Sequence, residues 1–508
     1  MGCLLALDQG TTGSTALVVH QDGRVLGRGY REFTQHFPEP GWVEHDPEEI
    51  LRATVEAARE ALGAAGERPA GIGITNQRET VVLWERATLA PVTRAIVWQD
   101  RRTTERCRAL KAAGWEPEIR RRTGLVLDPY FSATKLEWLF QDAALRRRAA
   151  RGELAAGTVE TWLVARLTGG AAHVTDHTNA SRTLLYDLVR GDWDPELLEL
   201  FGVPREVLPD IVPSAGVVGE AQREFFGAPL PIAGLAGDQQ AALFGQGCVR
   251  PGLAKNTYGT GAFLLSYLGV ERPPAPPGLL VTRAAGPAGE PAFALEGSVF
   301  IAGAAVQWLR DGLGLVARAA DSEALARSVP DTGGVYFVPA FVGLGSPHWE
   351  PDARGTVTGL TRGSTRAHLV RAALEAMAFS SADLAQAMTA GAGRGLEVLR
   401  VDGGAASNDW LMQFQADVLG VPVERPDNVE TTALGAAGLA GVALGIWRDS
   451  SAFLEGRRFT RFAPAASAAE RERHWAGWRR AVEAALAWAR AGRAGSGGEA
   501  RPPASSGS

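Results

Sequence analysis

The sequence predicts an α/β protein built from two similar lobes, and three observations support this. The chain has 508 residues, which predicts two or three compact units. Patterns typical of strands and helices alternate along it, as in proteins with covered sheets. A polar Gly/Thr turn between apolar stretches occurs at residues 7–14 and again at 256–263. Turn residues also recur for backbone reasons alone, so chance repetition remains an alternative explanation.

The first eighty residues predict a meander of strands followed by a helix. Apolar runs typical of strands cover residues 4–7, 15–19, 24–27 and 71–75. Turn residues, including Asp22-Gly23, separate the first three runs and predict antiparallel pairing. Asp46 and Pro47 form an N-cap and a first-turn proline. They predict a helix that ends at about Leu62.

The rest of the chain continues the alternation. We expect a helix at residues 160–167, a strand at 231–237, and a helix from about Asp409. The Gly/Ala-rich apolar stretch at residues 433–447 is too short to span a membrane, so it predicts a buried helix. Residues 491–508 are mostly Gly, Ser, Ala and Pro, a composition that predicts a disordered tail.

Composition limits the possible partners. The 52 basic and 57 acidic residues give a net charge of -5, with no basic cluster for nucleic acid or an anionic membrane surface. Three cysteines without CxxC spacing suggest neither a disulfide framework nor a zinc site. The N-terminus lacks the pattern of a signal peptide, which predicts a cytoplasmic protein.

Three Gly-rich elements are candidates for phosphate binding. The turns at residues 9–13 and 258–261 combine glycine and threonine, which allow close backbone approach and supply hydroxyl donors. Either turn alone is better explained as a structural hairpin, whereas the two turns together, with acidic residues nearby, favour phosphate binding. Residues 401–408 form a Gly-rich connection from a strand to a helix, which commonly meets a nucleotide. P-loop and protein-kinase signatures are absent from the sequence.

Two acidic residues lie at the ends of expected strands. Asp8 ends the first apolar strand, and Asp238 follows the strand expected at residues 231–237. Paired carboxylates in one cleft suit a magnesium ion held through waters, together with a base for a substrate hydroxyl. Either acid alone is also explained as a cap or turn residue.

Eight blocks carry a family resemblance: residues 6–12, 40–47, 73–80, 95–99, 128–132, 236–246, 255–261 and 401–404. In these blocks the chain resembles the glycerol kinase branch of the FGGY carbohydrate kinases, from about residue 3 to about residue 490. The resemblance implies two actin-like (ribonuclease H-like) lobes around a central nucleotide cleft. The implied polyol-binding lobe spans residues 1–245 and the nucleotide-binding lobe residues 246–490.

The resemblance implies ATP-dependent phosphorylation of glycerol to sn-glycerol 3-phosphate in glycerol catabolism, with Mg²⁺, and Asp238 as the general base. Its glycerol residues map to Arg78, Glu79, Trp98, Tyr130, Asp238, Gln239 and Phe263. Its nucleotide residues map to Thr11, Thr12, Gly13, Thr260, Gly303, Gln307, Gly404 and Asn408. Asp8 and Asp238 are the expected magnesium partners. Arg78 and Glu79 offer a donor and an acceptor to a polyol, although adjacent opposite charges also form surface ion pairs.

One departure and several alternatives accompany the resemblance. The family usually has an arginine shortly after the first Gly/Thr turn, where this chain has Thr15, so one cation at the transferring phosphate is missing. A pentulose or gluconate kinase of the same fold, a chaperone-like ATPase and a sugar-sensing repressor remain alternatives. The block at residues 76–79, with Trp98 and Tyr130, favours glycerol. The expected partners are glycerol, ATP and further copies of the chain in a dimer or tetramer, without nucleic acid or membrane insertion.

Overall fold

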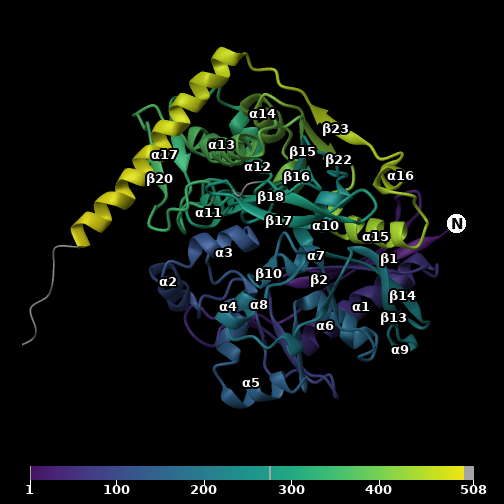
Figure 1. The fold of residues 1–508 in the computed structure, drawn as a ribbon. Helices are drawn as coiled ribbons and strands as arrows, with labels where there is room; N and C mark the ends of the chain where they lie inside the picture. The colour runs from purple at the N-terminus through teal and green to yellow at the C-terminus, as the bar shows by residue number, and fades with distance from the viewer. Residues whose placement is uncertain (1, 274–275, 497–508) are drawn as a thin grey trace, which may run out of the picture.

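The computed structural model describes residues 2–273 and 276–496, which form two lobes with one large β-sheet each (Figure 1). The first sheet has the order β13-β14-β5-β1-β2-β3, and the second has the order β17-β18-β16-β15-β21-β22-β23. The first comprises β1 (Cys3–Gln9), β2 (Gly13–His20), β3 (Val25–Glu32), β5 (Ile72–Asn76), β13 (Ala215–Ala221) and β14 (Leu230–Gly237). The second comprises β15 (Leu253–Tyr258), β16 (Ala262–Gly269), β17 (Leu280–Ala285), β18 (Pro291–Val299), β21 (Val398–Gly403), β22 (Val423–Pro426) and β23 (Phe459–Phe462).

The two sheets repeat one topology. In the first, β1 pairs antiparallel with β2 and parallel with β5, and β5 pairs parallel with β14. In the second, β15 pairs antiparallel with β16 and parallel with β21, and β21 pairs parallel with β22. The Gly/Thr turns at residues 9–13 and 258–261 therefore occupy equivalent hairpins. The repetition seen in the sequence reflects a structural repeat, and chance is not needed to explain it.

Local signals placed the early elements correctly. Strands β1, β2 and β3 form the expected antiparallel meander. Helix α1 (Pro47–Ala65) begins after Asp46, whose side chain accepts a hydrogen bond from the Glu48 backbone N–H. Helices α6 (Val159–Leu167) and α14 (Asp409–Leu419) are also found where the sequence predicted them. The starts of α1 and α14 are fixed by side-chain caps, which Asp46 and Asn408 provide from the position just before each helix.

Helices cover both faces of the first sheet. Along β1, Leu5 and Leu7 pack in the same cluster as α1, whereas Leu4 and Ala6 pack with α15 (Thr431–Ala443). This alternation is the normal two-residue period of a strand. Although α15 comes late in the sequence, it packs on β1, β5 and β14 and against α10 (Asp238–Gly245). Chain segments from both halves thus build the first lobe.

Glycines allow α15 to approach this closely. A Cβ at Gly435 would lie 1.8 Å from the Ala241 carbonyl oxygen of α10, and a Cβ at Gly73 would lie 2.0 Å from the Ala436 carbonyl oxygen. Neither distance is compatible with a side chain. The stretch predicted as a buried apolar helix is therefore α15, a tightly packed helix between the sheet and α10. No helix in the described ranges is long and apolar enough to cross a membrane.

We expect Gly435→Ala to lower the free energy of unfolding by about 1–3 kcal/mol, because the added methyl group must displace the backbone of α10. Gly63→Ala in α1 is the matched control, since a Cβ there meets nothing within 4 Å. That control should be neutral or slightly stabilising, because alanine favours a helix interior. Thermal unfolding measures both. Equal melting temperatures for the two variants would contradict the close packing of α15.

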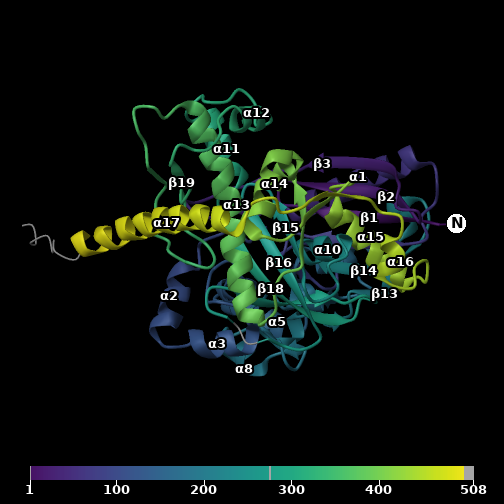
Figure 2. The same cartoon turned by 90° about the horizontal axis from the view of Figure 1, so that it is seen from above.

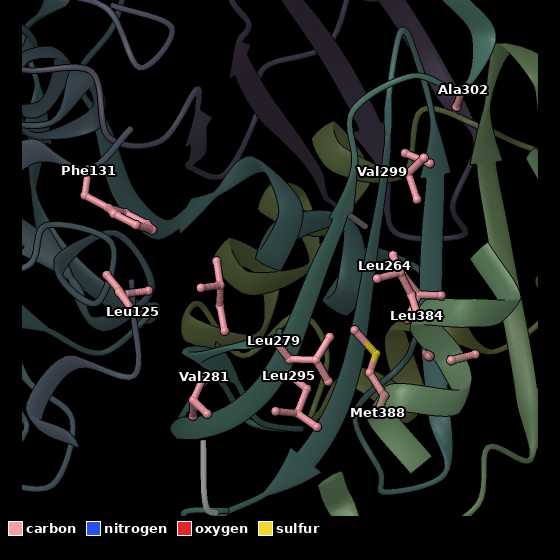
Figure 3. Close-up of a cluster of buried hydrophobic side chains, with 14 of the residues drawn as sticks. Leu125, Phe131, Leu264, Leu279, Val281, Leu295, Val299, Ala302, Leu384 and Met388 are labelled. Carbon is pink, nitrogen blue, oxygen red and sulfur yellow. The ribbon is translucent and has the colours of Figure 1, made fainter. Parts of the chain in front are cut away.

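The apolar core is continuous between the lobes. Figure 3 shows Leu125 and Phe131 of the first lobe facing Val281, Leu279 and Leu295 of the second. The backbone N–H of Val281 also donates to the Gly124 carbonyl at 3.0 Å. This contact holds β17 of the second sheet against the first lobe near the segment that carries Tyr130.

The remaining helices and short strands lie outside the two large sheets. Those of the first half are β4 (Glu44–His45), β6 (Val82–Glu85), β7 (Ala95–Ile96), α2 (Thr104–Ala112), α3 (Glu116–Thr123), α4 (Ser132–Leu139), α5 (Ala143–Ala150), β8 (Leu154–Gly157), β9 (Val174–Asp176), α7 (His177–Ala180), β10 (Tyr186–Asp187), β11 (Asp192–Trp193), α8 (Pro195–Leu200), η1 (Arg205–Val207), β12 (Asp210–Val212) and α9 (Arg223–Phe226). Those of the second half are α11 (Gly303–Asp311), α12 (Asp321–Arg327), β19 (Tyr336–Val338), β20 (Thr356–Thr358), α13 (Arg366–Ala392), η2 (Gly404–Ser407), α16 (Ser450–Leu454) and α17 (Ala468–Ser496).

Helix α17 corrects the expected start of the tail. It contacts α14, β19 and β20, and its C-terminal end projects from the second lobe (Figures 1 and 2). The helix extends to Ser496, so residues 491–496, predicted as disordered from their composition, are helical. Residues 497–508 of the predicted tail lie outside the described residues.

Candidate active site

The candidate site lies where parallel strands of the first sheet end. In β1, Asp8 is in register with Thr75 of β5, and Gly237 at the end of β14 is in register with Asn76. The residues that follow β5 and β14 therefore meet at one edge of the sheet. These are Gln77 to Glu79 after β5 and Asp238 at the start of α10. Carboxyl ends of parallel strands are the usual location for ligand sites in such sheets.

Arg78 is the centre of the site and is almost completely buried. Its two terminal nitrogens donate to the two carboxylate oxygens of Glu296 at 2.6 and 2.9 Å. Its Nε lies 3.3 Å from Oδ1 of Asp238, and its Nη2 lies 3.5 Å from the Tyr130 hydroxyl. Arg78 and Glu79 are therefore not a surface ion pair, the alternative that the sequence left open.

Glu79 is buried beside Arg78 and has a backbone φ of 62°. Residues other than glycine adopt a positive φ at a cost in free energy. Such backbone strain persists where the surrounding structure enforces it. Oε1 of Glu79 accepts a hydrogen bond of 2.7 Å from Nε of Arg182. Burial raises the pKa of Glu79, against the opposing influence of Arg78 and Arg182. The conformation of Glu79 is thus fixed by both its backbone and its partner.

Two aromatic side chains form one wall. The rings of Trp98 and Tyr130 meet edge to face with centroids 5.6 Å apart. The indole N–H of Trp98 donates to the Thr11 hydroxyl at 3.0 Å, so this wall contacts the first Gly/Thr turn directly. Burial raises the pKa of Tyr130 well above its ordinary value. Its hydroxyl therefore stays neutral and can both donate and accept a hydrogen bond.

The start of α10 supplies two more polar groups. The Asp238 side chain is 32% exposed, and its Oδ1 accepts the backbone N–H of Gln239 at 2.7 Å. The side-chain oxygen of Gln239 accepts a hydrogen bond from Lys255, a buried residue of β15 that also donates to the Thr257 hydroxyl at 2.9 Å. Burial lowers the pKa of Lys255 to about 8, while Asp402 and Asp238 oppose this shift. Lys255 brings a positive charge from the second lobe to the expected polyol side.

Phe263, the second expected apolar wall, lies on β16 in register with Thr257. It is partly buried and packs against an apolar cluster that includes Leu243 of α10 and Leu265 of β16. Both Phe263 and Lys255 thus come from the hairpin that carries the second Gly/Thr turn.

Asp8 and Asp238 repel each other, as expected of a site for a cation. The pKa of Asp8 is raised to about 8, first by burial and then by the negative charges of Asp238 and Glu430. Carboxylate oxygens are the ligands that Mg²⁺ prefers, and that ion usually keeps several waters. Within residues 2–273 and 276–496, no group of three or more His, Cys, Asp or Glu side chains is arranged to hold a metal. The pair fits an ion that relies on waters and phosphate oxygens for its remaining ligands.

The expected nucleotide residues fall into one group on each lobe. In the first turn, the Gly10 N–H donates to the Gly13 carbonyl, and the exposed Thr12 lies between them. The second lobe holds the other five residues, on three elements. The Thr260 carbonyl accepts the N–H groups of Ala302 and Ala304 at the start of α11. Tyr258 and Gly403 are paired in register, which brings the start of η2 beside the same turn.

These three elements of the second lobe leave polar groups accessible. Thr260, Gln307 and Gly404 are exposed, and a Cβ at Gly303 would lie 2.6 Å from the Gly259 carbonyl oxygen. Asn408 caps α14, because its side-chain oxygen accepts the Leu411 N–H at 2.9 Å. Its amide nitrogen is the part of this side chain that suits a nucleotide.

Sequence reasoning missed three buried charges. Lys255 opens the block at residues 255–261, but its local sequence does not mark it as a buried cation. Glu296 stands within an apolar strand, and an acid in such a run is a signal of a buried ion pair. Arg182 follows α7 without any local motif, so no signal in the sequence identifies it.

Comparisons with known proteins agree over nearly the whole chain. The N-terminal domain of the FGGY family of carbohydrate kinases matches residues 3–245, and the C-terminal domain of that family matches residues 254–444. A glycerol kinase of Symbiobacterium thermophilum is 55% identical over 493 residues, which cover 96% of this chain and 99% of the relative. Glycerol kinase 2 of Thermotoga maritima is 52% identical over 493 residues, with the same coverage of 96% and 99%.

Solved structures show the same architecture. Glycerol kinase of Plasmodium falciparum with ADP superposes with a TM-score of 0.90 at 34% identity, covering 96% of this chain and 98% of that one. Xylulose kinase of Lactobacillus acidophilus has a TM-score of 0.86 at 22% identity, covering 96% and 99%. At that identity the second likeness shows the fold alone.

Proposed function

The chain belongs to the FGGY family of carbohydrate kinases, and from this premise we propose that it transfers the γ-phosphate of ATP to glycerol. The product is sn-glycerol 3-phosphate. The observation that carries the proposal is the buried polar set around Arg78, which joins donors and acceptors for a small polyol to one aromatic wall. The relatives named glycerol kinase, more than half identical over nearly the full length, support the same substrate.

In this proposal the first lobe supplies the hydrogen-bonding groups for glycerol, and the second lobe supplies one apolar wall. The hydroxyls of glycerol are held by the polar groups of Arg78, Glu79, Tyr130, Asp238 and Gln239, and its carbons lie against Trp98 and Phe263. Asp238 is the general base that accepts the proton of the attacking hydroxyl. Its side chain is accessible, unlike that of Glu79, and Arg78 fixes its orientation through the contact at Nε.

ATP binds between the two hairpins. Thr11, Thr12 and Gly13 contact its phosphates from the first lobe, and Thr260, Gly303, Gln307, Gly404 and Asn408 hold the nucleotide from the second. Asp8 and Asp238 hold Mg²⁺, which neutralises charge on the transferring phosphate when it is bound. Thr15 is in register with Asp8, so the position where relatives usually carry an arginine offers no charge beside it.

We expect Asp8→Asn to raise the Mg²⁺ concentration needed for half-maximal activity by about 10-fold or more, because one of two carboxylates at the ion is lost. Asp22→Asn is the control, since Asp22 lies on a surface turn beside Arg24. Initial rates at fixed ATP over a magnesium titration give the comparison. An unchanged magnesium requirement in Asp8→Asn would remove Asp8 from the metal site.

A coupled ADP-release assay tests the proposed reaction directly. Glycerol should release ADP in proportion to glycerol 3-phosphate formed, and stereospecific oxidation of the product by glycerol-3-phosphate dehydrogenase identifies its configuration. Dihydroxyacetone, xylulose and gluconate test the alternative substrates of the same fold. ADP release with gluconate or xylulose but not with glycerol would refute the proposal.

Two finer features also belong to the proposal. We place the enzyme in the cytoplasm, where ATP is available, as a step in glycerol catabolism. We also expect a homo-oligomer, either a dimer or a tetramer. Light scattering coupled to size-exclusion chromatography measures the assembly.

A further inference from the structure

Glu296 joins the second lobe to the expected polyol residues of the first. It lies on β18, where it is in register with Leu265 of β16 on one side and Leu280 of β17 on the other. Its side chain has no exposed surface. Both of its carboxylate oxygens point to arginines from the first lobe, Arg78 and Arg182.

The contacts of Glu296 lead through the two arginines to two residues expected to bind glycerol, Asp238 and Glu79. Glu296 accepts two hydrogen bonds from Arg78, whose Nε faces Asp238. Glu296 also accepts a bond of 3.1 Å from Arg182, which in turn donates to Glu79 at 2.7 Å. One carboxylate on the second lobe therefore fixes the guanidinium groups that orient Asp238 and Glu79.

Electrostatics keep this carboxylate charged. Burial alone would raise the pKa of Glu296, yet Arg182 and Arg78 lower it to about 2. Two buried guanidinium groups lie against it, and each also faces Glu79. A neutral side chain at position 296 would leave the two cations with one nearby buried anion, so they would repel each other and lose their common anchor.

A fixed Arg78 matters because its neighbours cannot adjust. Glu79 is held in a strained backbone conformation, and Tyr130 lies under the Arg182 guanidinium with 5.6 Å from the charge to the ring centre. A side chain that loses its partner in this setting moves, and misplacement of a substrate by 1 Å costs about 10²-fold in rate. No other carboxylate in the described ranges forms a salt bridge with both arginines, apart from Glu79 itself.

We propose that Glu296 is a positioning residue for glycerol, which acts through Arg78 and Arg182 and so makes polyol binding depend on the second lobe. This inference rests on the proposed function. Because its side chain has no exposed surface, Glu296 contributes through the placement of Arg78, Glu79 and Asp238. The polyol pocket is then assembled from both lobes, although every expected hydrogen-bonding ligand of glycerol lies on the first.

The test is Glu296→Gln, which keeps the shape but removes the charge and one acceptor. We expect kcat/KM for glycerol to fall by about 10²-fold, through a higher KM for glycerol together with a lower kcat, while the KM for MgATP stays at the wild-type value. Glu424→Gln is the matched control. Glu424 is a largely buried carboxylate of β22 in the same sheet, and it also pairs with two arginines, Arg400 and Arg461.

The control separates positioning from stability. Both variants lose a buried ion pair, so both should melt below the wild type, but Glu424→Gln should keep the wild-type KM for glycerol. A wild-type KM for glycerol in Glu296→Gln, or an equal rise in Glu424→Gln, would overturn the inference. Failure of the wild type to phosphorylate glycerol would instead refute the proposed function.

A second variant keeps the test open if Glu296→Gln does not fold. Arg182→Lys retains the positive charge but loses the planar fork that contacts Glu79 and Glu296 together. We expect the same rise in the KM for glycerol at unchanged KM for MgATP. A folded Arg182→Lys enzyme with wild-type KM for glycerol would also overturn the inference.

Discussion

Replacing Asp238 with asparagine should lower kcat for glycerol phosphorylation by roughly 10²–10⁴-fold, with ATP binding retained. A carboxylate can accept the proton of the attacking hydroxyl, whereas a neutral amide of the same shape cannot. The geometry favours Asp238 over the other acid of the polyol side. The Asp238 side chain is 32% exposed at the start of α10, whereas Glu79 is buried and accepts a hydrogen bond from Arg182.

Asp321→Asn is a matched control for this variant. Asp321 is also the first residue of a helix, is 32% exposed and pairs with an arginine, Arg318, at 2.8 Å. It lies on α12, on none of the elements that carry the expected site residues, so its loss should leave kcat unchanged. ATP affinity is followed by nucleotide binding in the absence of turnover. Near wild-type turnover in Asp238→Asn would end its assignment as the base.

Glycerol should be preferred over xylulose by roughly 10⁴-fold in kcat/KM, because a five-carbon chain that cannot take the position of glycerol leaves the buried polar groups of the site unpaired. The polar groups of Arg78 and Glu79 are buried and fixed by protein partners, so they cannot rearrange for a longer chain. The Trp98 ring is likewise held by the Thr11 hydroxyl and the Tyr130 ring. Five-carbon ketoses must displace one of these groups.

Variants of the aromatic wall refine this prediction. Trp98→Ala should lower the ratio of kcat/KM for glycerol to that for xylulose, because it removes an aromatic wall that excludes the five-carbon substrate. Trp115→Ala is the control, because Trp115 is 40% exposed and precedes α3. Initial rates with both substrates give the ratio for each enzyme. Equal kcat/KM for xylulose and glycerol in the wild type would show that the predicted preference for glycerol is wrong.

Much of the site could be predicted because its signals are local. The Gly/Thr turns at residues 9–13 and 258–261 join adjacent strands, and Asp8 and Asp238 follow from strand ends. The same is true of the Asp46 cap of α1. Composition alone was a poorer guide, since the Ala- and Gly-rich residues 491–496 continue α17.

The sequence by itself determined the repeated hairpins, the Asp46 cap and the family, because each depends on residues close together in the chain. The tertiary structure decided that α15 completes the first lobe and that Arg78 is buried rather than exposed. It also placed Glu296 against Arg78 and Arg182, which are 218 and 114 positions away. Ion pairs at such separations exist only after the two lobes pack, so neither spacing nor composition specifies them.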